Sequence, residues 1–491
     1  MSDATVDGEL NPPRAALASL FPLPLSDFEY YMFVDDRPTH PMVFVVAVDV
    51  AGTLSRGAFE TAVSAALAVH PLFSCRIARV ARRGWCWVAD PQSAADIRWT
   101  EIPEPQSGER EAVSAVAAEW PDIPIQALDL QRHSGLLIEV MHRRLCGRIV
   151  FHLHHSCCDG IGALEFVGEI LARYGQQTAA EAESRPEFEP PCVQKLRDRD
   201  TMDTGPAVTQ RHRRSVKRVI GKVRRLLLRR PLPLRPLSAE SRSSAAPVPA
   251  RAIQSRMLPR SVSRGLRALA ARQSVSVNDL LIREMLLQIL DWNQRAGEVP
   301  SDSWLRVSVP VSMRTAQHER MPATNIVSYA FVTRRVSECR NPEELLASIH
   351  RQTSDVLYHR EGIVALRFLH FLRLIPGAMK LVLGFKSCFC TVVLANVGDL
   401  RKRFSGRMPL QRNLWVAGNL TVEGICGVAP VRQNTRAAVT IGEYGGHLCV
   451  HLRTDATVIS RDDTERFLAE YSERLVRLAA DRHAGFSATS P

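Results

Sequence analysis

The sequence predicts a mixed α/β protein built from two halves of similar size, and three observations lead to this fold class. Apolar, β-branched segments alternate with segments of helical periodicity along most of the chain. In the middle, the composition shifts to charged, Pro-rich and Ser-rich residues. The alternation begins again near Ala252. We therefore expect an N-terminal lobe over residues 1–185, an interdomain linker over 186–250 and a C-terminal lobe over 251–491.

In the first half, apolar spacing defines strands and helices in turn. The valine-rich stretch 43–50 favours a strand, and residues 54–69 place apolar side chains at helical intervals. A second helix is expected from Gly160 to about Gly175, where apolar residues again recur at helical spacing. Three further strands are predicted, at 84–88, 136–140 and 148–153. The last two are expected to pair through a turn near Cys146-Gly147.

The second half repeats this pattern. Helices are expected at 262–271 and 278–292, with Ser261 as the N-cap of the first and Ser276 or Asn278 as the N-cap of the second. Further helices are predicted at 345–357 and 462–478. Strands are predicted at 305–311, 327–336 and 391–394, followed by a hairpin of 437–444 with 447–454 around Gly445-Gly446.

Composition narrows the class of protein. Of the 491 residues, 45% are hydrophobic, which is ample for a sizeable core. No uncharged apolar stretch reaches the length of a membrane span, and the acidic first ten residues do not resemble a signal peptide, so we expect a cytoplasmic protein. The eleven cysteines have no framework spacing and are expected to be reduced. No metal-binding or nucleotide-cofactor motif occurs, so we predict neither a metal site nor a cofactor.

The net charge of +12 favours acidic partners, such as phosphates, anionic lipid, an acyl carrier protein or coenzyme A. Much of the excess is local, because eleven Lys/Arg and no acidic residue lie between Thr204 and Ala239. Residues 211–230 predict a basic amphipathic helix. This helix could lie on an anionic membrane, dock an acidic carrier protein or the phosphates of coenzyme A, or serve as a solvated tether. Nothing beyond the charge indicates nucleic acid.

The most informative segment runs from His154 to Gly160 and reads HHxxxDG. It lies between a predicted strand and a predicted helix, where side chains can face a cleft. Neutral histidine is well matched to accepting a proton near neutral pH. From the residues alone, His155 is either a general base or a histidine that ends a buried strand.

At this motif, the chain resembles the HHxxxDG acyltransferase superfamily. Its members include wax ester synthase/diacylglycerol acyltransferases, condensation domains of peptide synthetases and, more distantly, chloramphenicol acetyltransferase. Other landmarks follow in the family's order from about Leu20 to about Leu478: Pro24-Leu25-Ser26-Asp27, Val69-His70-Pro71-Leu72-Phe73 with Arg76, Val277-Asn278-Asp279, Val309-Pro310-Val311-Ser312-Met313-Arg314 and Ala395-Asn396-Val397-Gly398. The resemblance implies two chloramphenicol-acetyltransferase-like lobes with a channel between them.

The resemblance also implies roles for the motif. His155 would take the proton from the acceptor, with His154 in support. Asp159 would pair with Arg314 and hold the loop that presents His155; the alternative is a surface turn aspartate. Gly160 would allow a special backbone conformation or a close approach.

Four further positions have more than one possible role. Asn396 and Gly398 would form a turn across the channel, with a packing role or an oxyanion-binding role. Cys157 and Cys158 are better explained as small apolar filler than as thiol nucleophiles, because no third orienting group accompanies them.

The resemblance implies an O-acyltransferase that moves an acyl group from acyl-CoA to an alcohol or diacylglycerol by direct attack. A condensation-type enzyme with a carrier-bound donor or an amine acceptor is an alternative. A non-catalytic lipid-binding or carrier-binding module is another. The chain departs from wax ester synthases where Asp27 directly follows Ser26 and where Asp399 follows Gly398, and the DFGWG motif of plant acyltransferases is absent. Acyl length, acceptor, oligomeric state and pathway stay open.

Overall fold

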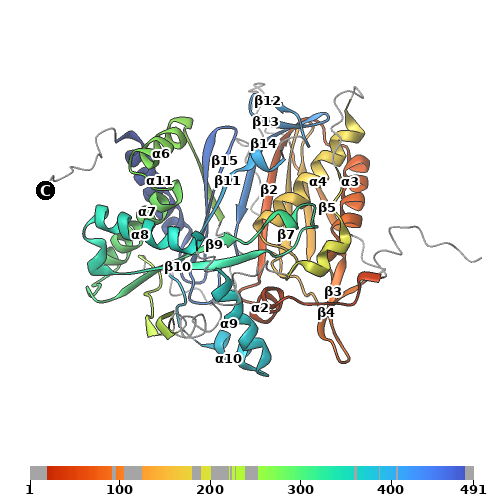
Figure 1. The fold of residues 1–491 in the computed structure, drawn as a ribbon. Helices are drawn as coiled ribbons and strands as arrows, with labels where there is room; N and C mark the ends of the chain where they lie inside the picture. The colour runs from red at the N-terminus through yellow and green to blue at the C-terminus, as the bar shows by residue number, and fades with distance from the viewer. Residues whose placement is uncertain are drawn as a thin grey trace, which may run out of the picture.

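The computed structural model describes residues 19–90, 95–103, 124–179, 189–200, 221, 224–226, 228–237, 253–358, 362–385, 387–404 and 407–481. Two α/β lobes lie side by side, and each packs helices against one large sheet (Figure 1). The described strands form a seven-stranded, a six-stranded and a three-stranded sheet. The mixed α/β class that the sequence predicts is confirmed.

The first lobe is organised around the seven-stranded sheet, in the order β12-β13-β14-β2-β7-β6-β5. Helices α3 (Arg56–Val69) and α4 (Gly160–Thr178) share one hydrophobic core with this sheet. Strands β2 and β7 are antiparallel along their full length, so that Val43 lies opposite His154. The strands of this sheet are β2 (Val43–Ala51), β5 (Asp96–Glu101), β6 (Leu136–His142), β7 (Cys146–His154), β12 (Leu410–Gln411), β13 (Leu414–Ala417) and β14 (Leu420–Val428).

The three-stranded sheet has the order β1-β4-β3. Its strands are β1 (Leu23–Pro24), β3 (Cys75–Val80) and β4 (Gly84–Ala89). Trp87 of β4 is completely buried, which ties this small sheet into the core of the first lobe.

The second lobe is organised around the six-stranded sheet, in the order β10-β9-β11-β15-β16-β8. Strand β11 runs parallel to both of its neighbours, β9 and β15, while the other pairs are antiparallel. The strands are β8 (Ile253–Leu258), β9 (Trp304–Ser312), β10 (Val327–Arg335), β11 (Val392–Asp399), β15 (Ala437–Tyr444) and β16 (His447–Thr454). The predicted hairpin of β15 and β16 is confirmed at both of its strands.

Helices cover this sheet and close a second hydrophobic core. They are α6 (Arg260–Arg272), α7 (Val277–Arg295), α8 (Pro342–Tyr358) and α11 (Arg461–Ala480). Ser276 caps α7, because its hydroxyl accepts the N–H of Asp279 while the Asp279 carboxylate accepts the N–H of Ser276. Ser261 is not the N-cap of α6, since that helix begins at Arg260, directly after Pro259. Proline fixes a backbone angle that suits the entry to a helix.

The sheets do not follow the predicted boundary between lobes. Strands β12, β13 and β14 belong to residues 251–491, yet they complete the sheet of the first lobe. β14 pairs with β2 from Val45 to Ala51. The chain therefore crosses back from the second lobe before it returns to form β15 and β16.

A third cluster lies between the lobes and was not predicted. It joins α2 (Asp27–Asp35), α9 (Gly362–Leu374) and α10 (Ala378–Gly384). The Ser26 hydroxyl caps α2 by accepting the N–H of Glu29 at 3.1 Å, and the Glu29 carboxylate accepts the N–H of Ser26 at 2.7 Å. The conspicuous Pro-Leu-Ser-Asp sequence is thus a helix start.

The described part of the linker packs against the lobes. Residues 189–200 include the 3-10 helix η3 (Val193–Asp198), and residues 228–237 run along the second lobe, where Leu234 is fully buried. Other 3-10 turns are η1 (Pro71–Ser74), η6 (Ala316–His318), η7 (Val336–Cys339) and η8 (Leu400–Phe404). Most of the predicted basic helix, residues 211–230, lies outside the described residues. None of the described helices is long and apolar enough to cross a membrane.

Candidate functional site

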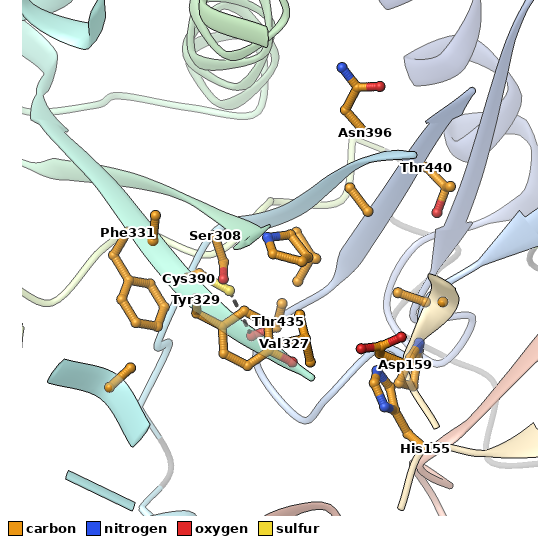
Figure 2. A pocket seen from close by; sticks show the side chains of 18 of the residues that line it. His155, Asp159, Ser308, Val327, Tyr329, Phe331, Cys390, Asn396, Thr435 and Thr440 are labelled. Atoms are coloured by element: carbon orange, nitrogen blue, oxygen red, sulfur yellow. Dashed lines mark hydrogen bonds between the residues drawn. The ribbon is translucent and has the colours of Figure 1, made fainter. Parts of the chain in front are cut away.

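His155 follows the last residue of β7 and faces a cavity between the lobes (Figure 2). Its N–H donates to the Met42 carbonyl at 2.7 Å. Its ring contacts two phenylalanine rings, with centroid distances of 5.1 Å to Phe44 and 5.8 Å to Phe28. Burial lowers the pKa of His155, although its own backbone and the Asp159 carboxylate oppose the shift. The imidazole is therefore neutral near pH 7 and can accept a proton.

Asp159 is buried, and its carboxylate accepts four hydrogen bonds. One comes from the N–H of Gly162 at 2.8 Å, so Asp159 caps α4. Another comes from the N–H of Ile326 at 2.9 Å. Arg314 donates the other two, at 2.8 and 2.9 Å. The expected pair of Asp159 with Arg314 is present. Burial raises the pKa of Asp159, but Arg314 and the two backbone donors outweigh it and lower that pKa overall.

A short strip of the second lobe, residues 323–326, holds the motif in place. The Asn325 amide donates to the carbonyls of His155 and Ser156, both at 2.9 Å. At the start of the strip, the N–H of Ala323 donates to Nδ1 of His70 at 2.8 Å. The loop that presents His155 is thus clamped from the opposite lobe. Asn325 carries no signature in the sequence, and its contact spans about 170 residues of chain.

Glu29 is a second residue that sequence analysis missed. It is fully buried, and Arg199 donates to both of its carboxylate oxygens at 2.8 Å. Trp87 also donates to this carboxylate, at 3.0 Å. The Ser156 hydroxyl donates to the Glu29 carbonyl at 3.2 Å, which connects this buried ion pair to the motif.

His154 and Gly160 lie in different surroundings, since only Gly160 is among the described residues that line the cavity. His154 is buried outside the described cavity lining, and its Nδ1 accepts the N–H of Ser156 at 3.1 Å. A Cβ on Gly160 would meet no atom within 4 Å, so Gly160 leaves space in the cavity instead of allowing a close approach. The close approach occurs at Gly162, where a Cβ would lie 3.0 Å from the Thr324 carbonyl oxygen and 3.1 Å from the Cys158 Cβ.

Asn396 and Gly398 belong to β11 instead of a turn after it. The strand continues to Asp399, with a bulge between Asn396 and Gly398. The Asn396 side chain accepts the N–H of Gly398 at 3.0 Å, which satisfies the backbone at the bulge. Figure 2 shows Asn396 at the end of the cavity away from His155. Asn396 therefore lines the cavity from the second lobe, as part of a bulged strand and not of a turn.

The cavity has a volume of about 980 Å³ and extends from His155 into the second lobe. Tyr329 and Phe331 of β10 and Ser308 of β9 form part of one wall (Figure 2). Arginines also line the cavity: Arg225, Arg229, Arg306, Arg314, Arg334, Arg351 and Arg432. Among the described lining residues, only Asp159 and Asp355 are acidic. The cavity thus combines apolar walls with an excess of positive charge.

Arg306 holds the end of the linker against the cavity. Its guanidinium donates to the carbonyls of Arg229 and Phe389, both at 2.7 Å, and to the Thr333 hydroxyl at 2.8 Å. Burial lowers the pKa of Arg306 to about 10, so the side chain keeps its charge at neutral pH. The described hydrogen-bond partners of Arg306 include no carboxylate, so its positive charge favours an anionic group nearby.

The remaining candidates have packing roles. Cys157 and Cys158 are buried, and burial raises the pKa of both thiols well above the ordinary range. Cys157 fills the space that a side chain at Gly135 would need. In the described residues, no group of His, Cys, Asp and Glu has the arrangement of a metal site.

No family model matches the chain. An uncharacterized protein of Mycobacterium tuberculosis is 24% identical over 468 residues, covering 92% of this chain and 99% of that protein. The first condensation domain of the calcium-dependent antibiotic synthetase superposes with a TM-score of 0.64 at 15% identity, covering 94% of this chain and 97% of that domain.

Two further solved structures share the fold. Polyketide synthase associated protein 5 from Mycobacterium tuberculosis has a TM-score of 0.59 at 16% identity, covering 93% of this chain and 98% of that one. Trichothecene 15-O-acetyltransferase from Fusarium sporotrichioides has a TM-score of 0.63 at 14% identity, covering 93% and 95%. These likenesses establish the two-lobed, chloramphenicol-acetyltransferase-like fold of condensation domains and acyltransferases.

Proposed function

We propose that this protein is an acyltransferase that moves an acyl group from a thioester to a hydroxyl or amine by direct attack, with His155 as the general base. The observation that carries this proposal is the position of His155, whose neutral ring faces a cavity of about 980 Å³ between the lobes. The carboxylate four residues later is saturated with protein hydrogen bonds. His155 is therefore the group of the motif that can reach substrate.

The proposed reaction needs no acyl-enzyme. His155 takes the proton from the acceptor, and the acceptor oxygen or nitrogen attacks the thioester carbonyl. The carbon–sulfur bond then breaks, and the leaving thiolate takes the proton back from His155. Cys157 and Cys158 play no part, because burial keeps both as thiols.

The finer proposal is an acyl-CoA donor and a lipid alcohol or diacylglycerol acceptor. Apolar side chains such as Phe368, Leu369 and Leu372 line part of the cavity and suit an acyl chain. The lining arginines suit the phosphates of coenzyme A or of a phosphopantetheine arm. A carrier-bound donor is the second candidate, since condensation-domain structures share the fold over more than nine-tenths of the chain.

The first test is release of free thiol from a panel of acyl-CoAs in the presence of long-chain alcohols or diacylglycerol. His155→Ala is compared with the parent protein and with His133→Ala, which removes an exposed histidine. We expect acceptor-dependent release that falls by about 10²- to 10⁴-fold only in His155→Ala, because a placed general base contributes about that factor.

The other outcomes would contradict the role of His155 or favour one of the alternative functions. Release that survives in His155→Ala would remove His155 as the base. Silence with every acyl-CoA, followed by transfer from an acyl carrier protein, would favour the condensation-type donor. Silence with both donors would favour a non-catalytic binding module and overturn the proposal.

A further inference from the structure

Helices α9 and α10 expose an apolar surface, which we name the α9–α10 face. They project from the edge of the molecule (Figure 1). Five large side chains on this face are strongly exposed: Phe371 by 57%, Leu374 by 66%, Ile375 by 46%, Leu381 by 65% and Phe385 by 53%. They make up half of the exposed large hydrophobic residues of the described chain, although they span only fifteen positions. Such clustering marks an interaction surface.

The opposite side of the same helices borders the cavity. Phe368, Leu369 and Leu372 of α9 line it, as do Met379 and Leu383 of α10. Leu372, Met379 and Leu383 also pack against α2 in the third cluster. Among the described residues, these two helices thus form a layer with one side on the cavity and the other side exposed. Whatever contacts the α9–α10 face lies one helix away from the proposed substrate space.

The charge of this face is positive. Residues 362–385 contain Arg367, Arg373 and Lys380 and no acidic residue. Arg37 adds a cation at the end of α10, where it donates to the Leu383 carbonyl at 2.5 Å. Asp27 of α2 compensates one charge, since it binds Arg373 at 3.2 Å and His370 at 2.9 Å. Lys380 is exposed and directly precedes the exposed Leu381 in the chain.

We propose that the α9–α10 face binds the surface of an anionic lipid bilayer. Exposed phenylalanine and leucine would enter the boundary between headgroups and acyl chains, while Lys380, Arg367 and Arg37 would face anionic headgroups. Positive charge beside these apolar side chains favours this occupant over a second copy of the chain, which carries the same charge. The proposal does not depend on the reaction, because binding is measured without turnover.

The test is co-sedimentation of the full chain with phosphatidylcholine vesicles, with and without phosphatidylglycerol. The test variant carries Phe371→Ser, Leu374→Ser and Leu381→Ser. A matched control carries Leu145→Ser, Met257→Ser and Leu410→Ser, which remove three exposed apolar side chains elsewhere. A third variant, Lys380→Glu, reverses one charge. Unchanged thermal melting establishes that each variant is folded.

We expect the parent and the control to bind vesicles that contain phosphatidylglycerol. The test variant should bind these vesicles more weakly, by about tenfold at least. Lys380→Glu and added salt should also weaken binding. Equal binding by the test variant would overturn the proposal and point to residues 211–230. No binding by the parent would also overturn the proposal. If the parent is a dimer and the test variant is a monomer, the occupant of this face is a second copy of the chain.

Discussion

Asp159 accepts hydrogen bonds from Arg314, from the backbone of α4 and from Ile326 of the opposite lobe. Each carboxylate oxygen is used twice, so little capacity remains for a substrate. The side chain fixes the start of α4 and joins the lobes behind His155. We infer that Asp159 is a positioning residue, whereas His155 contacts the reacting atoms.

Asp159→Asn should destabilise the protein by about 3 kcal/mol, because it leaves Arg314 without its anionic partner in a mostly buried site. Urea unfolding measures the change. Arg314→Gln should cost a similar amount, and the double variant should cost less than the sum of both. Asp96→Asn is the control, since Asp96 pairs with Arg98 on the surface and should change stability by less than about 1 kcal/mol. Additive single effects would contradict the assigned pair.

The pH dependence of activity tests His155 directly. Only the neutral imidazole accepts a proton, and burial lowers its pKa below the ordinary value. Activity should therefore persist as the pH falls past about 6.5, the usual pKa of histidine, and should decline only at lower pH. The measurement is kcat/KM against pH. An acid limb centred at or above about 6.5 would show that burial does not control this histidine.

At the level of elements, the start of α4 is the most constrained junction. Gly160 opens the helix and faces the cavity, whereas Gly162 lies against Thr324 of the opposite lobe. The two glycines are separated by one residue but have opposite surroundings. The helix therefore places its first turn between the cavity and the strip of residues 323–326.

Gly162→Ala and Gly160→Ala form a matched pair. Gly162→Ala should destabilise the protein by about 1–3 kcal/mol, because its Cβ would lie 3.0 Å from a carbonyl oxygen in the opposite lobe. Gly160→Ala should leave stability nearly unchanged, since no atom lies within 4 Å of its Cβ. Thermal melting compares them. A larger loss in Gly160→Ala than in Gly162→Ala would contradict this account of the junction.

The bulge in β11 is a second local feature, and it changes how this strand pairs with β15. Gly398 has a φ of 70°, which favours glycine, and the Asn396 side chain satisfies its N–H. The bulge shifts the register against β15 from Asn396 to Gly398. The Asn-Val-Gly sequence thus shapes a strand beside the cavity and does not supply a group near His155.

At the level of the whole molecule, strands β12, β13 and β14 from the C-terminal half of the chain complete the sheet of the first lobe. β14 covers the edge of β2 that would otherwise expose backbone donors and acceptors of a valine-rich strand. Arg453 of β16 also donates to the Val43 carbonyl at 2.8 Å. The cavity lies between elements whose relative placement is fixed by this exchange.

A fragment of residues 1–185 should therefore fail to fold by itself. Without β14, the edge of β2 is unpaired, and Val422 and Leu420 no longer complete the core. We expect insoluble or aggregated fragment, assessed by size-exclusion chromatography and near-ultraviolet circular dichroism, whereas the full chain stays soluble. A soluble monomeric fragment with a native-like spectrum would show that the first lobe is independent.

Much of the fold could be predicted from local pattern. Alternating and helical periodicities located the strands at 43–50 and 437–454 and the helices at 278–292 and 462–478, because one buried face imposes its spacing on the residues that form it. The motif also indicated the junction that presents His155, and the resemblance supplied Arg314 as the partner of Asp159.

Other features could not be predicted, because their partners are remote in the chain. No local sequence pattern marks Asn325, whose amide contacts the carbonyl of His155 only in the folded protein. Glu29 and Arg199 form a buried ion pair across about 170 residues, which no local pattern indicates. Helices α9 and α10 lack acidic residues and a clear amphipathic pattern, since one side faces the cavity and the other is exposed and apolar.

The sequence by itself determined most of the segments that become strands and helices, and it located the strand-to-helix junction that carries the histidine pair. These depend on spacing over a few residues. Only the tertiary structure decided that β14 pairs with β2, that residues 323–326 clamp the motif and that His155 opens on the cavity. Hydrogen bonding and burial between distant segments select these arrangements, and no local pattern encodes which distant segment will satisfy a given edge or carbonyl.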